Sequence, residues 1–207
     1  MEDNLKVEVY DIETYRAMFT LCVYIPSEDR RVQYEISRRK NELSGMVKYL
    51  LDGKRDYMVG FNNVRFDMQV LQYILDNYES WENLHGNEIV TLIYEFAQDI
   101  IRDQDYDKFP YREAYLDVPQ LDLRLVNHFD NLNRMVSLKF AFEFSLDGDI
   151  EELPFDFRSE HLSDEEMDQV IDYCWVDVNA THTGYKLVRG WTEHPDYKGK
   201  DKIQLLS

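Results

Sequence analysis

The sequence is poor in cysteine and contains no long apolar run. Cys22 and Cys174 are the only cysteines among 207 residues. Their separation argues against a disulfide framework or a cysteine zinc site, so we expect two reduced, mostly buried thiols. No apolar stretch reaches the roughly 18 residues of a membrane-spanning helix. The acidic start at Met1–Asn4 differs from the basic start of a signal peptide. We therefore expect no membrane span and a cytoplasmic location, which is the host cytoplasm if the chain is viral.

Basic residues are also scarce. The chain has 23 Lys and Arg against 41 Asp and Glu, which gives a formal net charge of -18. Binding to duplex nucleic acid depends on Lys and Arg that neutralise phosphates, so this charge argues against broad duplex binding. Any nucleic acid must therefore bind at a local site and not along a broad surface. The acids that crowd the segment from Asp147 to Asp177 are mostly interpreted as a solvated helix face and loop.

The pattern of apolar residues predicts an α/β domain. Three β-rich runs predict a strand meander over Leu5–Ile12, Ala17–Ile25 and Arg31–Ile36. Helical spacing and short apolar runs then predict helices over Asn41–Leu51, Phe66–Tyr78, Glu88–Ile101 and Arg134–Phe144, and strands over Tyr57–Phe61 and Val118–Leu123. Ser163 and Glu166 form a capping box, from which a long helix should run to Leu187. We expect a mixed central sheet flanked by helices over residues 1–189, with an insertion at 82–116 and a tail or linker at 190–207.

Two acids stand close together on the first predicted strand. Asp11 and Glu13 are two residues apart, so a strand aims both side chains from the same face of the sheet. Carboxylates placed together lose hydration and repel each other unless a divalent cation lies between them. Ordinary surface acids at an exposed strand end explain this pair equally well.

A third acid follows the strand predicted at Tyr57–Phe61. Asp67 falls in the first turn of the next predicted helix, where the positive end of the helix dipole favours a carboxylate and a nearby phosphate. Gly60 and the two following Asn residues are explained by turn chemistry alone. Taken singly, Asp67 is an ordinary helix-start acid.

The long predicted helix carries a fourth acid together with a phenol. Tyr173 and Asp177 are four residues apart and therefore lie on one helix face. The residues between them are largely apolar, which is unusual around an acid without a partner. A surface ion pair would need a nearby base, and no Lys or Arg occurs between Arg158 and Lys186.

Together the three sets resemble the DEDD exonuclease superfamily, and specifically its tyrosine subclass. The matching motifs are Asp11–Thr14, Asn63–Asp67 and Tyr173–Asp177, in the same order and with the same local spacing. The histidine subclass would need a histidine where Asp172 stands. The resemblance extends from about Val7 to Leu187 and is closest to the proofreading domains of family B DNA polymerases, including the protein-primed phage enzymes.

This resemblance implies a ribonuclease H-like fold and the removal of nucleotides from a single-stranded 3′ end, with DNA as the favoured substrate. It implies two Mg²⁺ or Mn²⁺ ions, one held by Asp11, Glu13 and Asp177 and the other supported by Asp67 largely through water. Two cations about 3.5 to 4 Å apart suit an in-line displacement at phosphorus. The resemblance gives Tyr173 the task of orienting the attacking water.

Further positions match less specific features of the family. The resemblance implies contacts with the single strand for Thr14, Asn63 and Phe66, although Phe66 fits a core position too. Lys139 resembles a lysine near the scissile phosphate of protein-primed polymerases and fits a surface helix lysine equally well. Asp122 follows a predicted strand, where we interpret it mainly as a turn residue that could also support the site.

The sequence also fits other functions. The charge also fits a catalytically inactive, acidic ribonuclease H-like scaffold or a mimic of nucleic acid, although such a protein gains nothing from Tyr173 next to Asp177. An RNA 3′ exonuclease would use the same motifs. The sequence carries no polymerase motifs, but the chain could be the front part of a polymerase.

Overall fold

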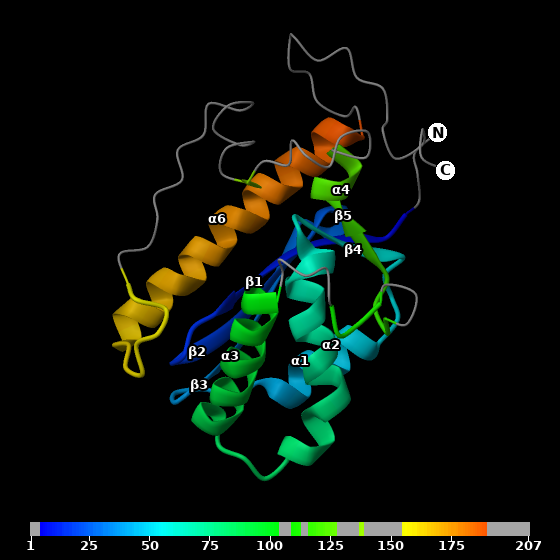
Figure 1. Ribbon diagram of the computed structural model, residues 1–207. Coiled ribbons are helices and arrows are strands. Elements are labelled where there is room, and N and C mark those ends of the chain that lie inside the picture. Colours follow the sequence, from blue (N-terminus) through cyan, green and yellow to red (C-terminus); the bar gives the residue numbers. More distant parts are fainter. Residues whose placement is uncertain (1–4, 104–108, 113–115, 128–136, 139–154, 190–207) are drawn as a thin grey trace.

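The computed structural model describes residues 5–103, 109–112, 116–127, 137–138 and 155–189. These residues form an α/β fold whose five-stranded sheet has the order β3-β2-β1-β4-β5. Antiparallel and parallel neighbours both occur in the sheet, and helices flank it (Figure 1). The predicted fold class is confirmed, and the arrangement is compatible with a ribonuclease H-like fold.

The first three strands form the predicted antiparallel meander. They are β1 (Val7–Thr14), β2 (Met18–Ile25) and β3 (Arg30–Ser37). Strand β1 continues two residues past the predicted end at Ile12, because Glu13 and Thr14 still pair with Thr20 and Phe19 of β2. Asp11 and Glu13 are therefore fixed by strand pairing.

Strands β4 (Tyr57–Gly60) and β5 (Gln120–Asp122) extend the sheet in parallel to β1. Their carboxyl ends meet, since Gly60 is the register partner of Asp122. Strand β5 is shorter than predicted at both ends: it begins at Gln120, and a short helix that the sequence did not indicate, α4 (Leu123–Asn127), begins directly after Asp122. Single 3-10 turns occur at Pro26–Glu28, Asn63–Arg65 and Tyr78–Trp81.

Helices cover both faces of the sheet (Figure 1). One face packs against α1 (Leu43–Leu51), α2 (Asp67–Asn77) and α3 (Gly86–Asp103), which share a large apolar core with β1 and β2. The other face packs against α4 and the long α6 (Asp164–Val188) in a second core, the α6-side core. Helix α3 lies inside the segment interpreted as an insertion, and it contributes Ile89, Val90, Ile93 and Ala97 to the larger core.

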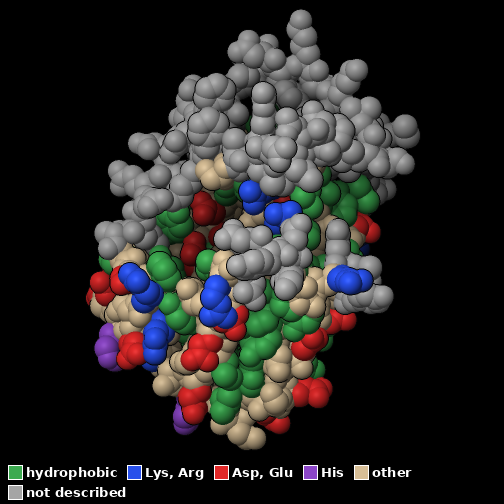
Figure 2. Space-filling model, in the orientation of Figure 1, with side chains coloured by type: hydrophobic (Ala, Val, Ile, Leu, Met, Phe, Trp, Pro, Cys, Tyr) green, Lys and Arg blue, Asp and Glu red, His purple; other side chains and the backbone are tan. Residues whose placement is uncertain are grey.

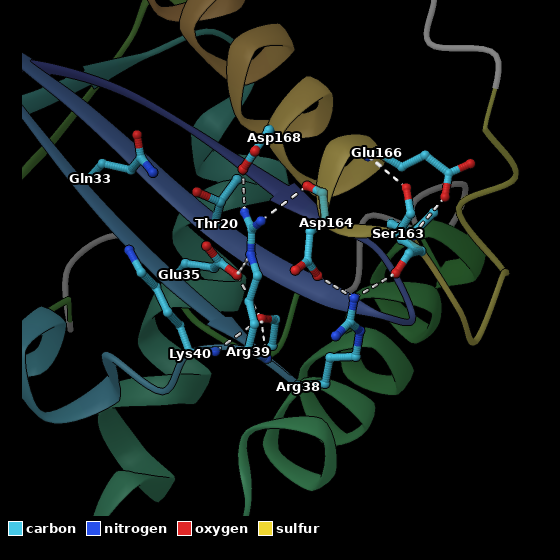
Figure 3. A network of polar contacts seen from close by, with 12 residues as sticks. Thr20, Gln33, Glu35, Arg38, Arg39, Lys40, Ser163, Asp164, Glu166 and Asp168 are labelled. Carbon is cyan, nitrogen blue, oxygen red and sulfur yellow. Dashed lines mark hydrogen bonds and ion pairs between the residues drawn. The ribbon is translucent and has the colours of Figure 1, made fainter.

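The start of α6 is fixed by its cap and by arginines from the β3–α1 connection (Figure 3). The predicted capping box is present: Ser163 Oγ accepts from the Glu166 N–H at 3.1 Å, and Glu166 Oε2 accepts from the Ser163 N–H at 2.7 Å. Arg38 forms an ion pair with Asp164. Arg39 forms two ion pairs, one with Asp168 at 2.6 Å and one with the buried Glu35 at 2.8 Å. This network anchors the helix that carries Tyr173 and Asp177.

Glycine allows α3 to begin against the end of β3. A Cβ built on Gly86 would lie 2.2 Å from the backbone oxygen of Ser37, so any other residue would force the helix and strand apart.

Among the described helices, none combines the length and the apolar character that a membrane span needs. The tail at 190–207, and most of the helix predicted over Arg134–Phe144, lie outside the described residues.

Candidate active site and metal centre

Strand β1 sends alternate side chains to opposite faces of the sheet. Tyr10 and Ile12 are buried in the larger core, whereas Val7 and Val9 are buried in the α6-side core. Because side chains alternate with a period of two, Asp11 and Glu13 continue the series that faces α6. The expected placement of both acids on one face is confirmed.

Helix α6 brings the third carboxylate to this pair. Asp11, Glu13 and Asp177 each offer one carboxylate oxygen, and these three atoms all lie within 4.8 Å of one another. All three side chains are partly buried. Helix α6 is positioned by Cys174 and Val178, which are buried on either side of Asp177 in the α6-side core. Residues far apart in the sequence thus form one compact set of carboxylate oxygens that could hold a metal ion.

Tyr173 lies one helical turn before Asp177 and interacts with the end of β1. Burial raises the pKa of the Tyr15 phenol, and the nearby Glu13 and Tyr173 raise it further. Tyr15 itself is buried in the α6-side core directly after β1. Tyr173 therefore lies near Tyr15, just beyond the end of β1, and one helical turn from Asp177.

Asp67 flanks the three-carboxylate group without belonging to it. It opens α2 as predicted and is only 7% exposed. Burial raises its pKa to about 7, with further contributions from Asp122 and Asp177, while hydrogen bonds from its own N–H and that of Ile12 act in the opposite direction. The Asp67 carboxyl thus lies close enough to the three-carboxylate group for the charge of Asp177 to raise its pKa.

Burial and the neighbouring carboxylates both disfavour the charged form of Asp11. Burial raises the pKa of this carboxyl well above its usual value, and the charges of Asp67, Asp177 and Glu13 raise it further. Figure 2 shows acidic side chains recessed in a hollow of the surface, with basic side chains beside them. A set of clustered carboxylates with raised pKa values is stabilised by a cation that supplies the opposing charge.

The residues matched to substrate contacts occupy different environments. Thr14 is partly exposed at the end of β1, and Phe66 is partly buried against the larger core just before α2. Asn63 has 0% exposed surface, and its Nδ2 donates to Gln120 Oε1 at 2.8 Å. Asn63 therefore joins the connection after β4 to β5, and its predicted contact with a single strand stays a prediction. Lys139 lies outside the described residues.

Asp122 is the turn residue that the sequence suggested. It is 4% exposed, and its carboxylate accepts from the N–H groups of Asn62 at 2.9 Å, Val64 at 3.3 Å and Arg124 at 2.8 Å. Gly60 is required at the end of β4, because a Cβ there would lie 2.6 Å from that of Asn63. Asp122 thus fixes the connection that leads from β4 to Asp67.

Sequence reasoning did not connect the two cysteines to the site. Cys22 is the register partner of Asp11 on β2, and both thiols are buried, as expected. The Cys174 thiol lies 3.4 Å from the backbone oxygen of Asp11 and 3.6 Å from its Oδ2, as a donor to either. Burial raises the pKa of Cys174, so the thiol remains protonated and able to donate. The pairing of the first two predicted strands could have placed Cys22 opposite Asp11. The contact between Cys174 and Asp11 depends on the packing of α6 and leaves no signal in the sequence.

The three motifs of the sequence meet at one site. The structure brings Asp11, Glu13 and Asp177 together, with Asp67 and Tyr173 beside them, while Asn63 is buried. Comparison with known proteins adds no family: no protein-family model matches the chain, and no curated protein is significantly similar to it.

Proposed function

We propose that this protein is a metal-dependent 3′–5′ exonuclease that removes nucleotides from single-stranded 3′ ends, preferably of DNA. The observation that carries the proposal is the group of Asp11, Glu13 and Asp177 oxygens within 4.8 Å of one another. Asp67 is coupled electrostatically to this group, and Tyr173 stands one helical turn from Asp177. The arrangement supports phosphodiester hydrolysis more directly than a scaffold role, which needs no clustered acids.

The residues fit a hard divalent cation. Their ligands are carboxylate oxygens, the donors that suit Mg²⁺ and Mn²⁺. Asp11, Glu13 and Asp177 would hold one ion, and Asp67 would support a second ion from its place at the start of α2. Two bound cations supply a water of lowered pKa and stabilise both the attacking and the leaving oxygens of an in-line displacement.

Two phenols and a thiol lie beside the carboxylates and can form hydrogen bonds there. Tyr173 would donate or accept a hydrogen bond to orient the water that attacks the terminal phosphodiester. The pKa of Tyr15 is raised by burial and by Glu13 and Tyr173, so its hydroxyl keeps its proton at neutral pH. Cys174 donates to Asp11 and restricts the orientation of that carboxylate.

The charge of the protein restricts its partners. With a net charge of -18, long duplexes are repelled, whereas a short single strand can be bound through cations and by stacking on aromatic rings. A covalently attached polymerase domain would supply such frayed 3′ ends, which makes proofreading a suitable role for this domain. An RNA 3′ end remains the alternative substrate and forms one arm of the test.

The test is digestion of 5′-labelled single-stranded DNA and RNA with Mg²⁺, with Mn²⁺ or with EDTA. We expect a ladder shortened from the 3′ end, dependent on the cation and faster on DNA. Asp11→Ala should reduce the rate at least about 1000-fold, equivalent to about 4 kcal/mol. Asp172→Asn is the matched control, because this exposed acid of α6 neighbours Tyr173 outside the carboxylate group. A wild-type protein that leaves both strands intact with either cation contradicts the proposal.

Tyr173→Phe separates the phenol from the carboxylates. The ring is kept and the hydroxyl removed, so we expect hydrolysis to slow by roughly 10- to 100-fold through the loss of one oriented hydrogen bond. The affinity for Mn²⁺, measured by calorimetry, should not change. Equal rates for the variant and the wild type would exclude Tyr173 from the mechanism.

A further inference from the structure

Two arginines adjoin the acidic site, which is unusual in so acidic a chain. Arg65 ends the 3-10 turn that leads into Asp67, and Arg124 is the second residue of α4, which begins at the end of β5. The two segments are fastened together, since the Asp122 carboxylate accepts from the N–H groups of both the Asn62–Val64 loop and Arg124. Arg124 also donates through Nη1 to the Asn62 side-chain oxygen.

Most N–H donors of the Arg124 guanidinium form no hydrogen bond with the described residues. A guanidinium carries five N–H donors, and only Asn62 receives a side-chain hydrogen bond from Arg124 within the described part of the chain. Its Nε is buried and has no hydrogen-bond partner among those residues, nor does Arg124 form an ion pair within 4.0 Å there. A buried donor left without a partner costs free energy, so this one marks a place for an acceptor that arrives from outside.

The two guanidinium groups lie close enough for the charge of one to act on the other. Burial lowers the pKa of Arg124, and the positive charge of Arg65 lowers it further, while Asp122 acts in the opposite direction. Like charges held close together are stabilised by an anion between them. Arg65 additionally lies 5.8 Å from the ring centre of Phe109. That segment is tied to α2 through Gln69, whose side chain bonds to both Val64 and Tyr111.

We infer that Arg65 and Arg124 together bind a phosphodiester group of the single strand, next to the carboxylates that cut its 3′ end. Arginine suits this task because its planar fork of donors matches phosphate oxygens. Arg65 lies two residues before Asp67, so the bound phosphate would adjoin the cluster of acids. The Phe109 ring, over which the Arg65 guanidinium lies, places an aromatic group beside this phosphate. The inference rests on the proposed function, and it explains how an acidic protein holds an acidic substrate.

The test is the affinity for a 5′-fluorescein-labelled dodecathymidylate, measured by anisotropy with Ca²⁺ in place of Mg²⁺. We expect Arg65→Gln with Arg124→Gln to weaken binding at least about tenfold, or about 1.4 kcal/mol. The salt dependence of binding should fall by about 0.7 per lost phosphate contact. Arg30→Gln with Arg102→Gln is the matched control, since it removes the same charge from exposed arginines that pair with Glu28 and Asp99.

Two further measurements keep the outcomes separate. Arg124→Lys retains the charge and should bind more tightly than Arg124→Gln, provided that both variants unfold at the wild-type temperature. If the double variant and the matched control bind the strand equally well, the inference is overturned. Hydrolysis of the same strand by the wild type tests the proposed function independently: binding that depends on the arginines, without hydrolysis in Mg²⁺ or Mn²⁺, overturns the exonuclease and supports the phosphate site.

Discussion

The two faces of strand β1 differ in what they bury. On the side of α1, α2 and α3, Tyr10 and Ile12 pack into a continuous apolar core together with Phe19 and Leu21 of β2. On the side of α6, the apolar series of Val7 and Val9 gives way to acids at the point where the helix crosses the strand. One strand thus contributes to stability with one face and carries the candidate site on the other.

This contrast shows where the fold tolerates an energetic cost. The charged form of Asp11 opposes folding, because burial removes its hydration and the neighbouring carboxylates repel it. The larger core offsets this cost, and a divalent cation would remove much of it. Substitutions on the two sides should therefore change stability in opposite directions, in the absence of metal.

The largest effect is expected on the apolar side. Phe19→Ala removes a ring with no exposed surface and leaves a cavity between β2 and the helices, so the free energy of unfolding should fall by about 3 to 5 kcal/mol. Urea unfolding followed by circular dichroism measures this loss. Leu5→Ala is the control at an exposed apolar residue, and it should change stability by less than about 0.5 kcal/mol. A similar loss in both variants would show that the core does not carry the stability.

A gain is expected on the acidic side. The pKa of Asp67 is about 7 in the folded protein against an ordinary value of 3.8, so between these pH values the folded state keeps a proton that the unfolded chain has lost. Unfolding free energy should therefore fall as pH rises from about 4 to 7. Asp67→Asn removes this dependence and should stabilise the metal-free protein at pH 8 by on the order of 2 kcal/mol.

Thermal unfolding in EDTA at pH 5 and pH 8 measures this difference. The wild type and the variant share His182, whose pKa burial lowers to about 4. This histidine makes the folded state more stable as the pH rises, which is opposite to the effect of Asp67. The comparison between the two proteins removes that contribution. A variant less stable than the wild type at pH 8 would mean that Asp67 contributes more through its hydrogen bonds than its charge costs.

The smallest effect concerns the helix that joins the two regions. Ser163→Ala removes the cap of α6 and its bond from Glu166, so stability should fall by about 1 kcal/mol. Ser44→Ala, at an exposed serine of α1, is the matched control and should change little. Equal unfolding midpoints for Ser163→Ala and the wild type would mean that the arginine network alone holds the start of α6.

Local patterns were sufficient for most of the fold and for the central acids. The alternation of β1 placed Asp11 and Glu13 on one face, and helical spacing placed Tyr173 beside Asp177, because both arrangements depend on neighbours in the sequence. The capping box marked the start of α6 for the same reason.

Features that depend on contacts between distant segments could not be predicted in this way. The burial of Asn63 follows from its bond to Gln120 on β5, and the meeting of Arg124 with the loop before Asp67 follows from the pairing of β4 with β5. Helix α4 was missed because its five residues are too few to show a period.

The binding of Mn²⁺ tests the central claim most directly, namely that the acids on the α6 side of β1 form a metal site. Calorimetric titration at pH 7.5 should show binding to the wild type, loss of the tighter site in Asp11→Asn and Asp177→Asn, and unchanged binding in Asp172→Asn. Wild-type affinity in both Asp11→Asn and Asp177→Asn would contradict the account.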